Sequence, residues 1–191
     1  MTFPFRLAPL AGLLVAGCAS YQPVTDNPVR IGPPYKVRGV TYVPADQPNY
    51  DAVGYASWYG NESGDRTARG EKFRPRGISA AHPTLPLPSY VEVTDLANGR
   101  TALVRVNDRG PFVRGRIIDL SRGAARLLGV ERQSPVAVRV RRVDPPEQDR
   151  KRLRKGKPAA ERPPLTGDAL AAQRARLALP RGSGTPSAGL R

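Results

Sequence analysis

The feature that most constrains the fold of this chain is a series of short alternating segments between residues 51 and 143. Stretches such as VGYASWYG, SYVEVTDL, RTALVRV, GRIIDLS and PVAVRVRRV alternate apolar with polar residues and are rich in β-branched and aromatic types. Gly, Pro, Asn or Asp residues separate them, which is the pattern of consecutive β-strands. Asn98 and Gly99 between two of these stretches predict a hairpin. A run of short strands of this length favours a small closed barrel.

One segment within this region departs from the alternation. Residues 121–129 begin with Ser121, a preferred N-cap residue, and end with Gly129, which suits the left-handed conformation that closes many helices. Apolar residues between them recur at helical spacing. We therefore expect a short helix over residues 121–129.

The flanking segments have a different composition. Residues 19–50 are Pro-rich, and we expect a lead-in linker with one short strand over residues 39–43. Residues 145–191 hold eleven Lys or Arg, four acids and no aromatic residue. Burial of so little apolar surface cannot offset the conformational entropy that the segment would lose on folding. We therefore expect a disordered tail, in which residues 168–179 form at most a marginal helix.

The net charge indicates the class of partner. The chain has 31 Lys and Arg against 16 Asp and Glu, a formal charge of +15. Such a charge favours polyanions, whether nucleic acid, anionic lipid or acidic polymer. We expect anionic surface contacts through residues 145–191.

The N-terminus indicates the cellular compartment. Arg6 precedes an apolar run over residues 7–17, which is too short to span a bilayer as a helix but suits a signal peptide. The sequence LVAGC that ends at Cys18 resembles a bacterial lipobox, which implies cleavage before this cysteine and its lipidation. Ala19 in place of an aspartate implies the outer membrane, facing the periplasm, with residues 1–18 removed. The alternative is a buried free cysteine after a chance apolar start.

Several kinds of chemistry are excluded by residue counts. His82 is the single histidine and Cys18 the single cysteine, so a zinc site lacks ligands. No Gly-rich phosphate loop is present, and no Gly-x-Ser-x-Gly motif supports a Ser–His–Asp triad. We expect neither a metal nor a cofactor. Secretion and a tail without aromatic residues for base stacking make nucleic acid an unexpected partner.

Three polar residues lie in or beside turn-rich segments of the strand region: Glu71, His82 and Asp108. Carboxyl groups and an imidazole that converge are suited to general acid–base work on a polar bond. Trp58 and Tyr59 offer flat rings on which sugars stack. Each residue also has a plainer explanation: a solvated loop acid for Glu71, and a core position for the histidine and the tryptophan.

Longer motifs decide between these explanations. GYASWYG, RTARGE, ISAAHPTLPLPSYVEVTDLANGR and VRVNDRGPF closely resemble the RlpA (rare lipoprotein A) family over residues 51–143. The resemblance implies a mainly β domain over residues 51–144, a six-stranded double-psi β-barrel with one or two short helices. It also implies an endolytic lytic transglycosylase, a carbon–oxygen lyase that cleaves the MurNAc-(1→4)-GlcNAc bond of peptidoglycan. The expected substrate is peptide-stripped glycan, and the expected products carry 1,6-anhydro ends.

The resemblance assigns roles to individual residues. Asp108 would protonate the leaving glycosidic oxygen and then act as the base for the sugar's own C6 hydroxyl, with a pKa raised by burial or by Glu71. Glu71 would position or polarise, and His82 would bind substrate or a carboxylate. Asp119 occupies the position of the key aspartate of expansins, or else it supports the helix that follows. The expected substrate-binding residues are Trp58, Tyr59, Asn107, Arg109 and Asp119, with Arg109 pointing away from Asp108.

The chain also departs from the family pattern. NESGD precedes the RTA motif and FRPRG follows the glutamate, so we expect one wall of the groove to differ. Many members end in a septal glycan-binding SPOR domain, where this chain has its basic tail. One alternative function is a non-catalytic, expansin-like binder of denuded glycan, and another is an electrostatic anchor. The expected partners are peptidoglycan strands and, through Cys18, a membrane.

Overall fold

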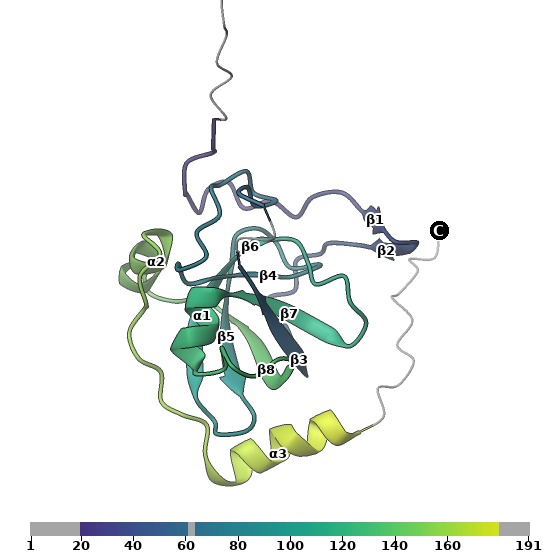
Figure 1. Ribbon diagram of the computed structural model, residues 1–191, viewed down its shortest axis with the longest axis vertical. Helices are drawn as coiled ribbons and strands as arrows, with labels where there is room; N and C mark the ends of the chain where they lie inside the picture. Colours follow the sequence, from purple (N-terminus) through teal and green to yellow (C-terminus); the bar gives the residue numbers. More distant parts are fainter. Residues whose placement is uncertain (1–19, 61–63, 180–191) are drawn as a thin grey trace, which may run out of the picture.

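The centre of the computed structural model is a closed barrel of six strands (Figure 1). The structure describes residues 20–60 and 64–179, so Cys18 lies outside the described residues. Around the barrel the strand order is β3-β7-β4-β6-β5-β8. This confirms the mainly β, six-stranded double-psi barrel. The barrel strands are β3 (Asp51–Tyr59), β4 (Ser79–Ala81), β5 (Ser89–Asp95), β6 (Thr101–Asp108), β7 (Arg116–Ser121) and β8 (Val136–Val143).

Two parallel pairs join strands that are far apart in the sequence. β3 pairs with β7 and β4 pairs with β6, whereas the remaining neighbours are antiparallel. The β4–β6 register shifts after Ala80, which lies opposite Val106, whereas Ala81 lies opposite Asp108. Such an irregularity bends a strand and re-aims the side chains that follow. Asp108 is therefore the residue whose direction this shift sets.

Alternate residues of the strands form a single large core cluster. Val104 and Val106 of β6 pack with Ile118 and Leu120 of β7, each at most 1% exposed. Burial of each such side chain contributes about 1.5–3 kcal/mol relative to exposure, so the alternation seen in the sequence is what closes the barrel.

The predicted helix and hairpin are both present. α1 (Arg122–Leu128) has Ser121 as its N-cap, whose side chain accepts a hydrogen bond from the Ala124 N–H, and left-handed Gly129 as its C-cap. β5 and β6 pair antiparallel around the turn that contains Gly99, whose φ is 77°. These local signals therefore predicted both elements correctly.

The C-terminal segment is not disordered where the structure describes it, so that prediction is wrong for residues 145–179. α2 (Glu147–Arg154) and α3 (Gly167–Ala178) lie against the barrel (Figure 1), and α3 coincides closely with the helix considered marginal. Leu153 of α2 belongs to the main core cluster and Leu170 of α3 is also buried. The apolar surface that these leucines need belongs to the barrel, so the composition of the tail does not reveal it.

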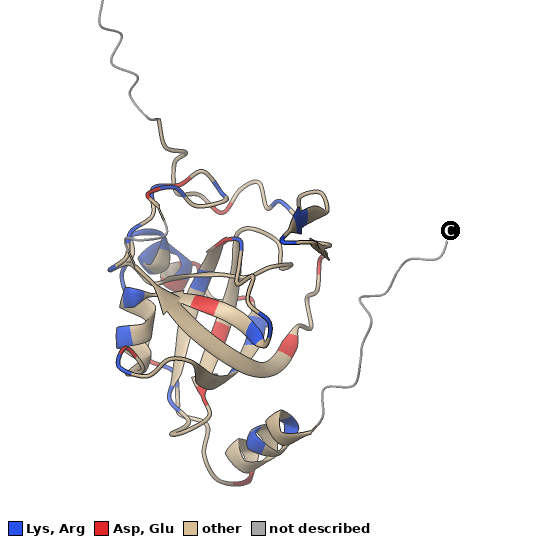
Figure 2. Ribbon diagram, turned by 45° about the vertical axis from the view of Figure 1, so that its right-hand side comes forward, with Lys and Arg blue, Asp and Glu red and all other residues tan. Residues whose placement is uncertain are grey.

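Basic residues hold this segment in place. Arg162 bonds to Asp149 and forms an ion pair with Glu92 of β5, while Arg174 of α3 donates to the backbone carbonyls of Leu96 and Ala97. All three helices carry Lys or Arg, coloured blue in Figure 2. None of the described helices has the length and apolar character needed to cross a membrane.

The lead-in is also attached to the barrel. β1 (Tyr35–Val37) and β2 (Val40–Tyr42) form a hairpin, so the predicted strand over residues 39–43 is present, with a partner that the sequence did not indicate. Before it, the Gln22 N–H donates to the Gly70 carbonyl at 2.8 Å. Arg30 and Leu87 exchange two backbone hydrogen bonds, each of 2.8 Å. The lead-in therefore covers one side of the barrel.

Candidate functional site

Two aspartates flank one alanine across three neighbouring strands. Ala81 of β4 is in register with Asp108 of β6 on one side and with Asp119 of β7 on the other. Residues in register on adjacent strands point to the same face, and the strands lie about 4.8 Å apart. Burial raises the pKa of the Tyr59 hydroxyl, and the charges of Asp108 and Asp119 raise it further. Both carboxyl groups therefore lie near the Tyr59 ring. The two acids therefore face a shared space with only a methyl group between them.

Asp108 is a half-buried acid, and one of its carboxyl oxygens is held by hydrogen bonds. Its Oδ1 accepts hydrogen bonds from the backbone N–H groups of Ala68 at 2.7 Å and Arg109 at 2.8 Å. Burial nevertheless raises the pKa of Asp108, and the nearby Glu71 charge adds a smaller increase. Of the two causes expected from the sequence, burial is the main one. The side chain is thus suited to hold a proton that Oδ2 can deliver.

Asp119 is the second acid of this face. Burial raises its pKa, opposed by the charge of Arg116 and by the Ser57 backbone N–H. Its Oδ1 is buried without a hydrogen bond in the described part of the chain, and the Arg116 Nε lies 3.6 Å away. Ser121, and not Asp119, caps α1. The alternative role of Asp119, support of the N-terminus of α1, is therefore filled by Ser121.

Glu71 lies at the centre of a buried ion cluster and is not a solvated loop acid. Arg105 donates to both of its oxygens, at 2.7 and 2.8 Å, and the Asn107 Nδ2 donates to Oε2 at 2.8 Å. Glu71 also closes a turn, because its carbonyl accepts from the Thr67 N–H at 2.9 Å. That turn carries the Ala68 N–H that holds Asp108. Glu71 thus acts on Asp108 through the backbone.

Arg105 is a functional candidate that the sequence did not single out. Its guanidinium also reaches Asp26 Oδ1 at 3.2 Å and the Thr25 carbonyl at 2.8 Å, both in the lead-in. Asp26 in turn accepts from Tyr90 and from Arg154 of α2. An arginine at an alternating strand position usually faces solvent, so its sequence context conceals this burial.

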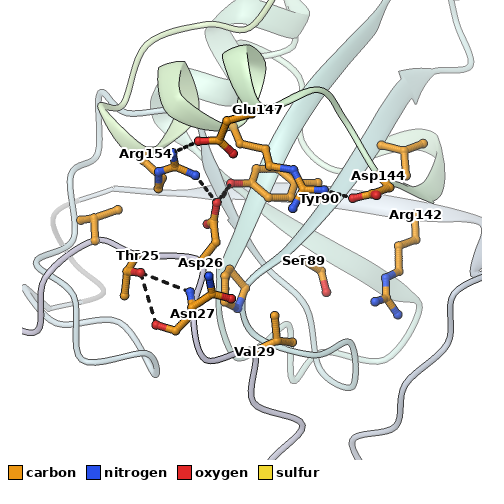
Figure 3. A pocket seen from close by; sticks show the side chains of 14 residues that line it. Thr25, Asp26, Asn27, Val29, Ser89, Tyr90, Arg142, Asp144, Glu147 and Arg154 are labelled. Atoms are coloured by element: carbon orange, nitrogen blue, oxygen red, sulfur yellow. Dashed lines mark hydrogen bonds and ion pairs between the residues drawn. The ribbon is translucent and has the colours of Figure 1, made fainter.

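The same ion network lines a separate hollow of about 490 Å³ (Figure 3). Asp26 lies between Tyr90 and Arg154 there, and Arg154 also contacts Glu147. None of the residues predicted for the site lines this hollow. The ion pairs of Arg154 with Asp26 and Glu147 in this hollow connect the lead-in with α2 beside the barrel.

His82 is a neutral donor beside Asp108. Its Nδ1 accepts from the backbone N–H groups of Thr84 at 3.2 Å and Leu85 at 3.0 Å, which assigns the ring proton to Nε2. Burial, reinforced by the charge of Arg109, lowers the pKa of His82 to about 3. The buried Nε2 has no partner in residues 20–60 and 64–179. The His82 backbone N–H donates to the Asp108 carbonyl at 3.0 Å, which fixes the two residues side by side.

The two predicted aromatic residues occupy different places. Tyr59 is buried and stacks on Phe73 with ring centroids 4.8 Å apart, and its hydroxyl has no partner among the described residues. Trp58 is half-buried, and its indole Nε1 donates to the Glu131 carbonyl at 3.0 Å. Trp58 also lines an open hollow.

The side chains of Arg109 and Asn107 are bound to other protein groups and do not face the candidate site. Arg109 points away from Asp108, as expected, but its guanidinium donates to the carbonyls of Leu85 and Ile31. Asn107 donates to Glu71 and is buried. Both side chains are already used inside the protein, so they support the site instead of lining it.

The described residues contain no group of three His, Cys, Asp or Glu side chains that could hold a metal ion. What the arrangement offers instead is two carboxyl groups with raised pKa values, a neutral imidazole N–H and an aromatic wall. These groups can transfer a proton to and from a polar bond and can bind a sugar ring.

Comparison with known proteins gives consistent matches over the barrel. The family model described as lytic transglycolase matches residues 51–140. The endolytic peptidoglycan transglycosylase RlpA of Yersinia pestis is 48% identical over 120 residues, which are 62% of this chain and 32% of that protein. RlpA of Pseudomonas aeruginosa strain UCBPP-PA14 is 53% identical over 114 residues, 59% of this chain and 33% of that protein. RlpA of Rickettsia felis is 43% identical over 115 residues, 58% and 50% respectively. The matches therefore span between a third and a half of the length of these relatives.

Proposed function

We propose that the chain, whose barrel matches the lytic transglycolase family model and the RlpA relatives, is an RlpA-type endolytic peptidoglycan lytic transglycosylase. The observation that carries the proposal is Asp108. Its pKa is raised by burial, one of its oxygens is fixed by two backbone N–H groups, and the other accepts no hydrogen bond from residues 20–60 and 64–179. A protonated acid in a fixed orientation is what cleavage of a glycosidic bond needs.

In the proposed reaction Asp108 acts twice. It first gives its proton to the GlcNAc O4 as the bond from this oxygen to the MurNAc C1 breaks. The resulting carboxylate then takes the proton of the MurNAc C6 hydroxyl while that oxygen bonds to C1. The products are a GlcNAc 4-hydroxyl and a 1,6-anhydroMurNAc end, and no water is consumed. One acid suffices because the nucleophile belongs to the substrate, unlike the paired carboxylates of hydrolytic glycosidases.

The neighbouring groups have supporting roles in this proposal. His82, 1% exposed, is a positioning residue: its ring stays neutral because its pKa is far below 7, and its backbone N–H holds the Asp108 carbonyl. Asp119, on the same face, lies where it can bind sugar hydroxyls or stabilise positive charge at C1. Glu71 is a positioning residue, since its carboxylate is bound to Arg105 and Asn107.

We also propose peptide-stripped strands as the preferred substrate and wall remodelling during daughter-cell separation as the setting. The protein would be anchored in the outer membrane through a lipid on Cys18 and would face the periplasm. The LVAGC motif supports this location, and the basic surface of α2 and α3 supports additional contacts with anionic material.

The test compares the chain from residue 19 onward with its Asp108→Asn variant on amidase-stripped peptidoglycan. We expect mass spectrometry to detect anhydro-ended glycans, and the variant to lose at least about a hundredfold of the rate. Asp168→Asn, an exposed change on α3, is the matched control and should keep full activity. If no form releases anhydro ends but all of them sediment with the glycan, the protein is a binding module and the proposed reaction is wrong.

A further inference from the structure

A second open hollow, of about 630 Å³, combines an aromatic wall with arginines. We call it the arginine hollow. Three guanidinium groups and two aromatic rings line it, with no acidic residue among its lining residues. Its lining is Trp58, Gly60, Phe73, Arg74, Pro75, Arg76 and Arg122.

The backbone beneath these arginines is held firmly against α1. The Gly123 N–H donates to the Pro75 carbonyl at 2.8 Å, and the Ser121 hydroxyl donates to the Gly77 carbonyl at 2.6 Å. A side chain at Gly123 could not fit, because its Cβ would lie 2.3 Å from the Arg76 carbonyl oxygen. The loop that carries Arg74 and Arg76 is therefore fixed in advance of any ligand, which reduces the entropy lost on binding.

The arginines of the hollow differ in their partners. Arg122 is bound to Glu131 at 2.6 Å, and its guanidinium lies 5.9 Å from the centre of the Trp58 ring. Arg74 and Arg76 are exposed, and their side chains have no hydrogen bond or ion pair within residues 20–60 and 64–179. Two unpaired guanidinium groups on one rigid loop form a site for a carboxylate, to which guanidinium groups bind with strong charge-assisted hydrogen bonds.

The arginine hollow adjoins the acids of the candidate site. Phe73 lines the hollow and stacks on Tyr59, whose hydroxyl is close enough to Asp108 and Asp119 for their charges to raise its pKa. On β3, Trp58 follows Ser57, the partner of Asp119 in β7. Successive side chains of a strand point to opposite faces, so the connection between the hollow and the acids runs through Phe73 and Tyr59 and not through Trp58. A glycan strand placed over Asp108 can extend into the hollow.

We propose that the arginine hollow is a subsite for a MurNAc residue that has lost its stem peptide, with Arg74 and Arg76 binding the freed lactyl carboxylate. The sugar ring lies against Trp58 and Phe73. A stem peptide converts this carboxylate into a neutral amide, which removes the charge that the arginines bind. The subsite therefore distinguishes stripped from peptide-bearing strands. This inference rests on the proposed function in that it assumes a peptidoglycan strand in the groove.

The test measures binding of the non-cleaving Asp108→Asn protein to two soluble glycans. One is amidase-stripped glycan, and the other is the same material with its lactyl carboxylates converted to methylamides. We expect the free carboxylates to improve the affinity roughly tenfold. The added double change Arg74→Gln and Arg76→Gln should lower binding of the stripped glycan to the level of the amidated one, with an unchanged melting temperature.

The matched control removes two positive charges elsewhere. Lys151 and Lys155 are exposed on or beside α2, outside the arginine hollow, and their change to Gln should leave the discrimination intact. Equal binding of the two glycans, or an equal loss in this control, would overturn the subsite. Anhydro ends released by the unaltered protein without discrimination between the glycans would leave the proposed function standing and the subsite wrong. If the protein binds the stripped glycan more tightly than the amidated one but cleaves neither, the subsite stands and the proposed function is wrong.

Discussion

At the scale of single residues, the site depends on a carboxyl group kept in surroundings that disfavour its charge. Burial raises the pKa of Asp108 above its ordinary value of 3.8, in spite of the two N–H groups on Oδ1. The folded protein therefore binds this proton more tightly than the unfolded chain. The stability contributed by the protonated form is lost as the pH rises through the raised pKa. The raised pKa that suits Asp108 to proton transfer therefore lowers the free energy of unfolding at neutral pH.

We therefore expect Asp108→Asn to be more stable than the unaltered protein near neutral pH. Asn can keep both N–H contacts of Oδ1 and carries no charge to bury. The gain in melting temperature should be a few degrees at about pH 7.5 and should shrink towards about pH 4, where Asp108 regains its proton. Thermal unfolding across this range measures it. A gain that is constant with pH, or a loss at neutral pH, contradicts the raised pKa of Asp108.

The pair Glu71 and Arg105 gives a second prediction at this scale. Each side chain is at most 2% exposed, so removal of one partner leaves a buried charge without its counter-ion. We expect Glu71→Gln or Arg105→Gln to lower the free energy of unfolding by about 3–5 kcal/mol. The double change should cost much less than the sum, since it removes both charges. Urea unfolding of the four proteins measures the coupling, and additive losses would show that the two groups act independently.

At the scale of secondary-structure elements, the local sequence pattern correctly predicted those elements that depend on residues close together in the sequence. Alternation indicated the strands, Asn98-Gly99 indicated the hairpin, and Ser121 with Gly129 indicated α1. The parallel pairing of β3 with β7 could not follow from periodicity, because it depends on contacts distant in the sequence; the family resemblance implied the type of barrel but no particular strand pairing was predicted. α2 was missed because its one buried leucine packs on surface that the barrel provides. Arg105 was missed because an arginine at an alternating strand position usually faces solvent, whereas FRPRG, which carries Arg74 and Arg76, was expected to change one wall of the groove.

The prediction for α2 tests whether it belongs to the folded domain. Leu153 is 4% exposed and lies in the main core cluster, so Leu153→Ala should cost about 2–5 kcal/mol of unfolding free energy. Leu179→Ala is the matched control, since Leu179 is 66% exposed at the end of α3, and it should change stability by less than about 0.5 kcal/mol. Urea unfolding decides the matter, and equal, small effects would mean that α2 is not packed in solution.

At the scale of the whole molecule, the attached lead-in would set how far the barrel can lie from the membrane in the proposed lipid-anchored protein. The Gln22 N–H bonds to Gly70, in the turn that also supplies the Ala68 contact of Asp108. If Cys18 carries the proposed lipid, four residue steps join the anchor to Gln22, at most about 14 Å of chain. A free linker over residues 19–50 would have allowed far more. On this proposal the docked lead-in would hold the acid-bearing end of the barrel close to the lipid.

This geometry makes a prediction about anchoring and reach together. Cys18→Ala should move the protein from the membrane fraction to the soluble fraction, because one modified cysteine provides the proposed tether. Insertion of about twenty Gly and Ser residues between Ala19 and Ser20 should keep the protein in the membrane fraction while adding roughly 25 Å of average reach. We expect the extended protein, anchored in vesicles, to release more anhydro ends from added sacculi than the unaltered protein does. Retention of the Cys18→Ala variant in the membrane fraction would show that a lipid on Cys18 is not what anchors the protein. Normal anchoring with unchanged release would show instead that the short tether does not limit access to the wall.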